Sequence, residues 1–300
     1  MTIPALPPLP PRSATEIVDG AVQLIRPEFG YFLRIAAIGA IPALLQAVIT
    51  LLVFPSVRMD PAAMLRREYT MLPLTLLTYA FATMQSGAVI AGALALLRGD
   101  QLPTVWEAFM TAFRRIFALL GANLLLIVVL LIVLLPVILA IGFVFASSGA
   151  ALTSFAGGRT GTVVAAGIAI VLLMLFLLAA LSIFARSAIM TALVIAERLG
   201  PWAAFKRSQF LSVGSYLRLA KTYGLVMVII VVVYSVIAGV ALTLRDQQAL
   251  VQAILSVLII PVVPILGAIM LLTYADLRVR REGADLDAAL DALTGLPAYG

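Results

Sequence analysis

The chain has 300 residues, of which 63% are hydrophobic and only 11% are charged, and its mean hydropathy is +1.16. Soluble domains carry about 25% charged residues, so this composition excludes a water-soluble globule and predicts an integral membrane protein. Cysteine and histidine are absent, which excludes disulfides, thiol or imidazole catalysis and Cys/His metal sites, and the net charge of +6 is too dispersed for nucleic-acid binding.

A proline-rich tail, residues 1–12, opens the chain and lacks the basic and apolar regions of a cleaved signal peptide. Residues 13–282 form one predicted domain, because no polar segment is long enough for a separate soluble domain. A helix needs about 20 apolar residues to cross a bilayer. We therefore expect an all-α membrane protein with a cytoplasmic tail over residues 283–300. Its six predicted transmembrane helices are Phe29–Phe54, Met71–Leu97, Leu119–Ala146, Thr162–Ala185, Leu217–Leu244 and Ala249–Tyr274.

Amphipathic helices are predicted between these spans, on one side of the membrane. Ser13 with Glu16, and Thr104 with Glu107, have the spacing of a capping box, in which a hydroxyl and a carboxylate satisfy free N–H groups at a helix start. A third such helix starts at Pro201, a residue suited to the first helical position. Two interpretations fit this order: three repeats of helix, span and span, or the ordinary placing of amphipathic helices at a membrane interface.

The orientation in the membrane follows from the basic residues, because Lys and Arg concentrate in cytoplasmic loops. With both termini on one side, that side carries 15 of the 20 basic residues. We therefore expect both termini in the cytoplasm. A basic cytoplasmic face also predicts contact with anionic lipid.

Three amides stand in otherwise apolar spans: Gln46, Gln85 and Asn123. We expect them to form hydrogen bonds between helices. Small residues at positions 87, 91 and 95 are spaced by four, which predicts a face for close helix packing, within the bundle rather than in a dimer.

The predicted fourth helix continues past its span and carries Arg186 and Glu197, eleven residues apart. That spacing is close to three helical turns, so the two residues share a face. One interpretation is a polar line that leads into a cavity. The other is that Arg186 marks the interface and extends its guanidinium to the headgroups.

The stretch TYADLRVRREGADLDAAL, residues 273–290, places dense charge directly after the last span. It resembles the closing signature of a bacterial integral membrane family related to the membrane domain of glycerophosphoryl diester phosphodiesterases. Residues 185–214 and 16–36 resemble the central and N-terminal blocks of that family. The resemblance implies a membrane fold in the bacterial inner membrane. It does not imply the phosphodiesterase activity, since that chemistry uses histidines in a separate barrel and this sequence has none.

The order of charges in this stretch exceeds what a membrane anchor needs, so we expect a cytoplasmic charge network. In it, Arg278 and Arg280 would pair with acidic groups on the interfacial helices and lock the C-terminal tail under the bundle. The members of the predicted network are Arg186, Glu197, Asp276, Arg278, Arg280 and Glu282.

No catalytic set emerges from the sequence, and we expect a non-enzymatic protein without a cofactor: a scaffold or accessory subunit, with a protein partner in a membrane complex. The alternative is a carrier or channel for a lipid or small amphiphile, because prolines interrupt several spans. A continuous polar cavity lined by Arg186 and the three amides would favour the carrier, whereas a dry core would favour the scaffold.

Overall fold

The computed structural model describes residues 12–53, 61–150, 181–243 and 248–283, with single positions at 167, 171, 174 and 176. Every regular element in these ranges is a helix, so the all-α prediction is confirmed for them. The predicted tails, apart from Arg12 and Gly283, lie outside the described residues, as does most of the predicted span Thr162–Ala185.

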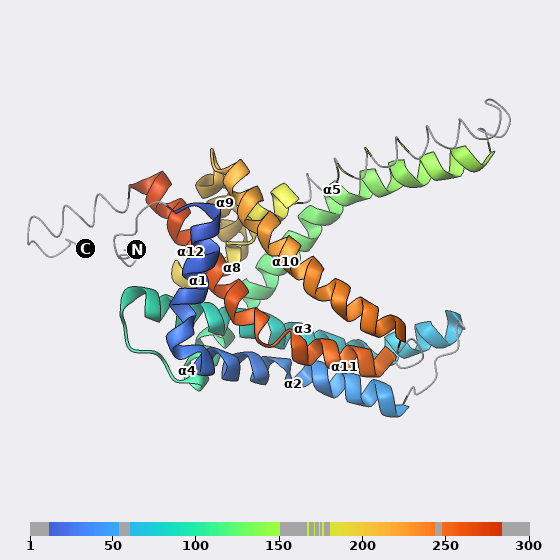
Figure 1. The fold of residues 1–300 in the computed structure, drawn as a ribbon, viewed down its shortest axis with the longest axis horizontal. Coiled ribbons are helices and arrows are strands. Elements are labelled where there is room, and N and C mark those ends of the chain that lie inside the picture. The colour runs from blue at the N-terminus through green and yellow to red at the C-terminus, as the bar shows by residue number, and fades with distance from the viewer. Residues whose placement is uncertain are drawn as a thin grey trace, which may run out of the picture.

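Eleven helical elements are labelled in the described ranges, and the helical residues 181–187 lead into α8. Figure 1 shows α1, α8, α9 and the end of α12 gathered at one end, from which the long helices extend. The elements are α1 (Ala14–Ile25), the 3-10 helix η1 (Arg26–Glu28), α2 (Phe29–Val53), α3 (Pro61–Arg98), α4 (Val105–Phe113), α5 (Ile116–Ala150), α8 (Met190–Ala196), α9 (Pro201–Ser212), α10 (Tyr216–Thr243), α11 (Gln248–Leu258) and α12 (Val262–Glu282).

Three helical stretches are long and apolar enough to cross a membrane: Ala14–Val53, Leu65–Arg98 and Val262–Glu282. Two bent pairs raise the number to five if each pair forms one span. The pair α4 and α5 bends by 65°, and the pair α9 and α10 bends by 109°. The chain therefore has the helices of a membrane protein, with three to five candidate spans in its described part, and the predicted number of six stays a prediction.

The capping boxes predicted for α1 and α4 are both present. Ser13 Oγ accepts a hydrogen bond from the Glu16 N–H, and Glu16 Oε2 accepts one from the Ser13 N–H at 2.6 Å. Thr104 and Glu107 make the same reciprocal pair at the start of α4. These local bonds satisfy N–H groups that a helix start leaves free.

The predicted span Ala249–Tyr274 is not one continuous helix. A turn over residues 259–261 separates α11 from α12, where Pro261 and Pro264 each lack the N–H that a helix interior requires. Helix α12 then continues through the charged stretch to Glu282, and Gly283 ends it with a left-handed φ of 63°. The charged residues from Asp276 to Glu282 are therefore the last turns of a helix.

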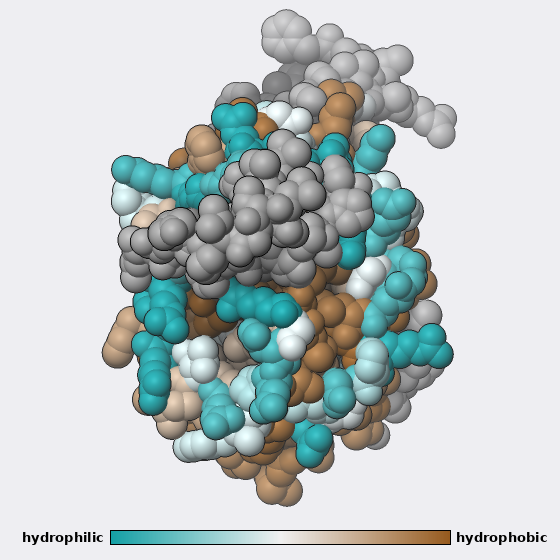
Figure 2. Space-filling model, turned by 90° about the vertical axis from the view of Figure 1, so that its left-hand side faces the viewer, coloured by the Kyte–Doolittle hydropathy of each residue, from teal (hydrophilic) through white to brown (hydrophobic). Residues whose placement is uncertain are grey.

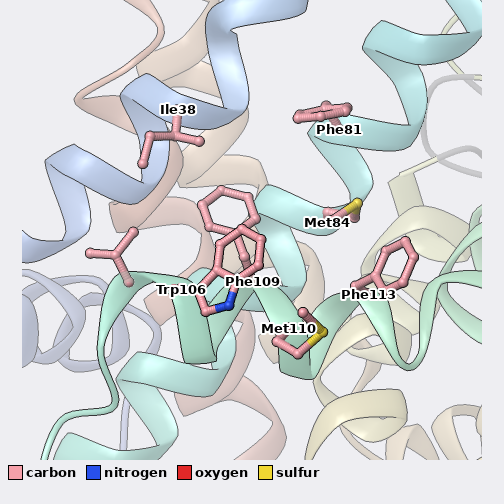
Figure 3. Close-up of a pocket in the computed structure, with 8 residues that line it drawn as sticks. Ile38, Phe81, Met84, Trp106, Phe109, Met110 and Phe113 are labelled. Carbon is pink, nitrogen blue, oxygen red and sulfur yellow. The ribbon is translucent and has the colours of Figure 1, made fainter.

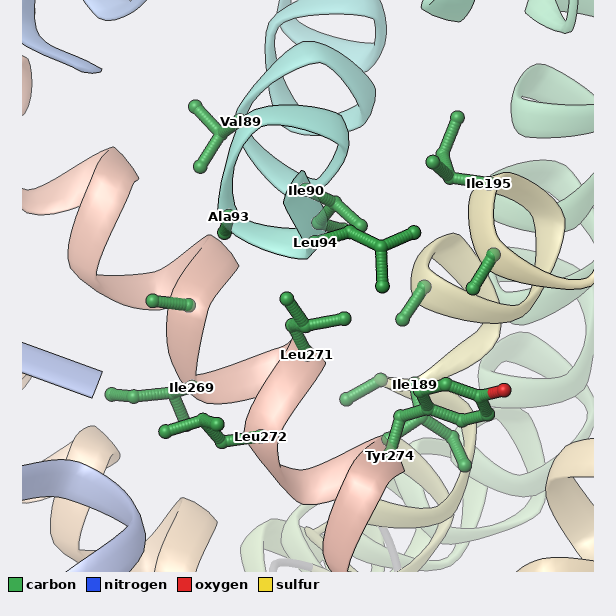
Figure 4. Packing of buried hydrophobic residues seen from close by; sticks show 14 of the residues in the cluster. Val89, Ile90, Ala93, Leu94, Ile189, Ile195, Ile269, Leu271, Leu272 and Tyr274 are labelled. Carbon is green, nitrogen blue, oxygen red and sulfur yellow. The ribbon is translucent and has the colours of Figure 1, made fainter. Parts of the chain in front are cut away.

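The hydrophobic core lies where α3, α8 and α12 meet (Figure 4). Ile90 of α3, Ile189 beside α8 and Leu271 of α12 are fully buried there. The long helices instead expose large apolar side chains, such as Leu52 at 73% and Ile132 at 67%. Such apolar surface is expected of helices that contact lipid.

Close helix contacts in the bundle depend on glycine. A Cβ on Gly87 would lie 2.9 Å from Leu119 Cδ1, and one on Gly92 would lie 2.8 Å from the Tyr31 ring. The small-residue segment of α3 therefore faces other helices of the same chain. Likewise, a Cβ on Gly39 would lie 2.6 Å from the Cβ of Gln85.

We expect Gly39→Ala to destabilise the protein by about 1–3 kcal/mol, because the added methyl group overpacks the contact between α2 and α3. Thermal unfolding in detergent measures the loss. Gly30→Ala is the matched control on α2, since its Cβ would meet nothing within 4 Å. Equal unfolding temperatures for the two variants would contradict this account of the contact.

Candidate functional site

A group of charged side chains of the described chain lies at the end of the bundle where α1, α9 and α12 meet. Figure 2 looks onto this end and shows hydrophilic side chains around its rim, with hydrophobic ones between them. Two carboxylates lie beneath this surface. The side chains of Glu197 and Asp276 are each only 3% exposed.

Glu197 is the C-cap of α8. Arg207 of α9 donates to it from Nε to Oε2 at 3.1 Å and from Nη2 to Oε1 at 3.3 Å. The hydroxyl of Tyr274 donates to Oε1 at 2.9 Å. A carboxylate at a helix C-terminus faces the negative end of the helix dipole, and a buried charge is costly unless it is paired. These three bonds supply that pairing and join α8, α9 and α12.

Arg207 also connects Glu197 to the end of α12. Its Nη2 lies 2.5 Å from Glu282 Oε1, and Glu282 Oε2 accepts a hydrogen bond from Arg278 Nε at 3.1 Å. Tyr274, Arg278 and Glu282 are spaced by four, so they lie on one face of α12. We call these five residues the Glu197 cluster.

The second carboxylate, Asp276, holds the start of the described chain. It accepts a hydrogen bond from the backbone N–H of Arg12 at 2.8 Å and from Nε of Arg280 at 3.0 Å. Arg218 of α10 lies 3.4 Å away. Arg280 in turn donates from Nη2 to the Arg12 carbonyl at 3.0 Å. Helix α12 therefore holds both backbone polar groups of Arg12, and we call these four residues the Asp276 cluster.

Five of the six residues in the predicted charge network lie in these two clusters, and Arg186 does not. The Nη1 of Arg186 donates to Gln209 Oε1 at 3.3 Å, and its guanidinium lies 4.1 Å from the ring centre of Tyr216. The predicted pairing also differs in detail. Arg278 and Arg280 contact carboxylates of their own helix, Glu282 and Asp276.

Sequence reasoning did not include four residues that complete the clusters. Arg207 and Tyr274 bind Glu197, while Arg12 and Arg218 bind Asp276. One signal was available in the sequence, because the spacing of four from Tyr274 onward places it on the face that carries Arg278. No spacing rule links Arg207 to α12, since their contact is made across the fold.

The three amides of the spans join neighbouring helices. Gln85 Nε2 donates to the carbonyl of Ala36 at 2.9 Å, and this bond connects α3 to α2. Asn123 Nδ2 donates to Thr83 Oγ1 at 3.2 Å, which connects α5 to α3. Gln46 does the same between α2 and α3 through the hydroxyls of residues 75 and 78. None of the three lines the pocket described next.

An apolar pocket of about 560 Å³ lies between α2, α3 and α4 (Figure 3). Helix α4 supplies most of its wall, and Trp106 at its edge is 71% exposed. A pocket without charged walls suits an apolar ligand. The lining residues are Ile38, Phe81, Met84, Val105, Trp106, Phe109, Met110 and Phe113.

In the described part of the chain, no group of three or more His, Cys, Asp or Glu side chains is placed to hold a metal ion.

We expect Arg207→Met to destabilise the protein by about 3–5 kcal/mol, because it leaves Glu197 buried without its cation. Adding Glu197→Gln to this variant should recover part of the loss. Lys206→Met is the control, since it removes the same charge from an exposed position on α9. Unfolding by heat in detergent compares the variants, and similar losses for Arg207→Met and Lys206→Met would count against the cluster.

We expect Asp276→Asn to loosen the start of the chain, because it weakens charge-assisted hydrogen bonds worth about 1.5–3 kcal/mol. Hydrogen exchange of the α1 amides should become about tenfold faster. Asp19→Asn, on the exposed side of α1, is the control. Unchanged exchange in Asp276→Asn would show that α1 is held by its apolar contacts alone.

No family model matches the chain, and no match was found among the curated proteins or the solved structures.

Proposed function

We propose that this chain is a non-enzymatic, multi-spanning membrane protein that serves as a scaffold or accessory subunit of a membrane complex. The observation that supports the proposal is how the two buried carboxylates are hydrogen-bonded. Glu197 accepts hydrogen bonds from α9 and α12, and Asp276 accepts them from the Arg12 backbone and from Arg280 of its own helix. A carboxylate held in this way stabilises a rigid surface and is poorly placed to exchange protons with a substrate.

The proposed topology has six spans, both termini in the cytoplasm of a bacterial cell and the charged clusters at the inner face of its membrane. The two ends of the described chain support it, because Arg12 is hydrogen-bonded to α12. The order of α4 before α5, and of α9 before α10, fits the proposed repeats of helix, span and span. Membership of the membrane-domain family, which the sequence resembles, is a prediction in the same way as this topology.

A protein partner would dock on the rim of the charged end. Helix α9 exposes Trp202 at 58% and Phe210 at 47%. The guanidinium of Arg207 lies 5.8 Å from the ring centre of Phe210 and is fixed by two carboxylates. Exposed aromatic side chains beside a rigid ionic base are the composition of a binding hot spot. Anionic lipid would surround this docking surface through the exposed arginines.

The alternative function, a carrier for a lipid or small amphiphile, is favoured by one observation. The apolar pocket under α4 is within the size range of small-molecule sites. The amides do not extend it into a polar path, since each is bonded to a neighbouring helix. We therefore keep the carrier as the second candidate.

Photo-cross-linking in the native membrane tests the proposal. A photoreactive amino acid at Trp202 should give one discrete protein adduct at near-stoichiometric yield, whereas the same amino acid at Leu76, on the apolar surface of α3, should not. Transfer of a fluorescent lipid across proteoliposomes by the purified chain alone would instead support the carrier and contradict the scaffold.

A further inference from the structure

The apolar pocket beside α4 takes one wall from a single face of that helix. Trp106, Met110 and Phe113 line the pocket and are spaced by four and three residues, so they lie on one face of α4. Across the pocket lie Ile38 of α2 and Phe81 of α3 (Figure 3). A cavity of about 560 Å³ with apolar side chains on all these walls is suited to a hydrocarbon ligand.

The remaining faces of α4 have other roles. Ala108 and Ala112 are fully buried, and a Cβ on Gly87 of α3 would lie 3.0 Å from the Cβ of Ala112. Glu107 and Thr111 are exposed polar residues. Helix α4 therefore packs on α3 with one face, exposes polar groups on a second, and turns its aromatic face to the pocket. The aromatic face is the part of α4 that has space beside it for a ligand.

The pocket is open toward the lipid-facing surface of the long helices. Ile38 and Phe113 line it and are also exposed at the surface. On α2, Ile41 and Leu45 continue the face of Ile38 as exposed apolar side chains. In a membrane protein such a surface contacts lipid chains. A ligand therefore reaches the pocket from the hydrocarbon of the bilayer, which argues against a water-soluble metabolite and indicates a lipid.

The exposed face of α2 changes from charged to apolar beside the pocket. Arg34 precedes Ile38 by four residues and is exposed on the same face. Its Nε donates to the carbonyl of Gly30 at 3.2 Å, so the side chain extends back toward the start of the helix. Trp106, at the pocket edge, is of the residue type enriched at the boundary between lipid headgroups and chains. From Arg34 to Ile41 the surface thus follows the order of a phospholipid, with the headgroup first and the chain after it.

We propose that the pocket holds one acyl chain of a membrane phospholipid whose headgroup phosphate lies beside Arg34. A chain inside the pocket gains van der Waals contacts from α2, α3 and α4, more than a chain on a single helix surface gains. An arginine beside the phosphate adds a charge-assisted hydrogen bond. The bound lipid joins the aromatic face of α4 to the two long helices. This site does not depend on the scaffold function, because a resident lipid suits a scaffold and a carrier alike.

The two tryptophans of the chain provide the first test. Trp202→Phe leaves Trp106 as the only tryptophan, and a phospholipid with brominated acyl chains quenches its fluorescence on contact. Titrated into the purified protein in detergent, this lipid should quench Trp106 until close to one lipid is bound per chain. Trp106→Phe is the matched control, since it leaves only Trp202 on α9, where quenching should rise without saturation. Equal, unsaturated quenching of both tryptophans would overturn the proposal.

The second test changes the pocket and the headgroup position separately, in the Trp202→Phe protein. Ile38→Phe adds bulk inside the pocket and should weaken binding of the brominated phospholipid by about tenfold. Leu51→Phe is its control, because Leu51 is a similarly exposed residue of α2 that does not line the pocket. Arg34→Gln, at an exposed position, should weaken phospholipid binding by about tenfold or more and leave the binding of a brominated alkane unchanged. The proposal is overturned if Ile38→Phe binds the lipid as tightly as Leu51→Phe, or if Arg34→Gln binds the phospholipid as tightly as the parent protein.

Discussion

The ion pair between Glu197 and Arg207 is the contact on which the charged end of this protein depends. A carboxylate that is 3% exposed keeps its charge only where a cation and hydrogen-bond donors replace water. Arg207 and Tyr274 do so from two other helices. Because Arg207 also reaches Glu282, the same guanidinium fixes the last turn of α12. One buried charge thus determines how three helices meet.

Helix α12 can organise this end because it carries paired acidic and basic side chains on two of its faces. Tyr274, Arg278 and Glu282 lie on one face, and Asp276 with Arg280 lies on another. The first face binds α8 and α9, while the second holds Arg12 and α10. Each carboxylate has its own arginine four residues further along or back on the same helix, which gives partial compensation before the other helices add theirs.

Away from the charged end, the bundle depends on close packing and a few hydrogen bonds. Because lipid tails are as apolar as the helices, burying apolar side chains between helices gains little free energy in a membrane. Glycines such as Gly39 and amides such as Gln85 therefore supply the specific contacts. This division explains the candidate functions. In the proposed function, the charged end would offer a rigid surface to a protein partner, whereas in the alternative the apolar pocket by α4 would hold a hydrophobic ligand.

The sequence by itself determined the features that depend on neighbouring residues: helical class, membrane character, both capping boxes and the shared face of Tyr274, Arg278 and Glu282. These follow from composition and from spacing along one helix. Only the tertiary structure decided the turn that separates α11 from α12, the bends before α5 and α10, and the pairing of Glu197 with Arg207. These features depend on contacts between segments that are distant in the sequence. A buried carboxylate pairs with the cation that is nearest in space, and residue spacing along one helix does not identify that cation.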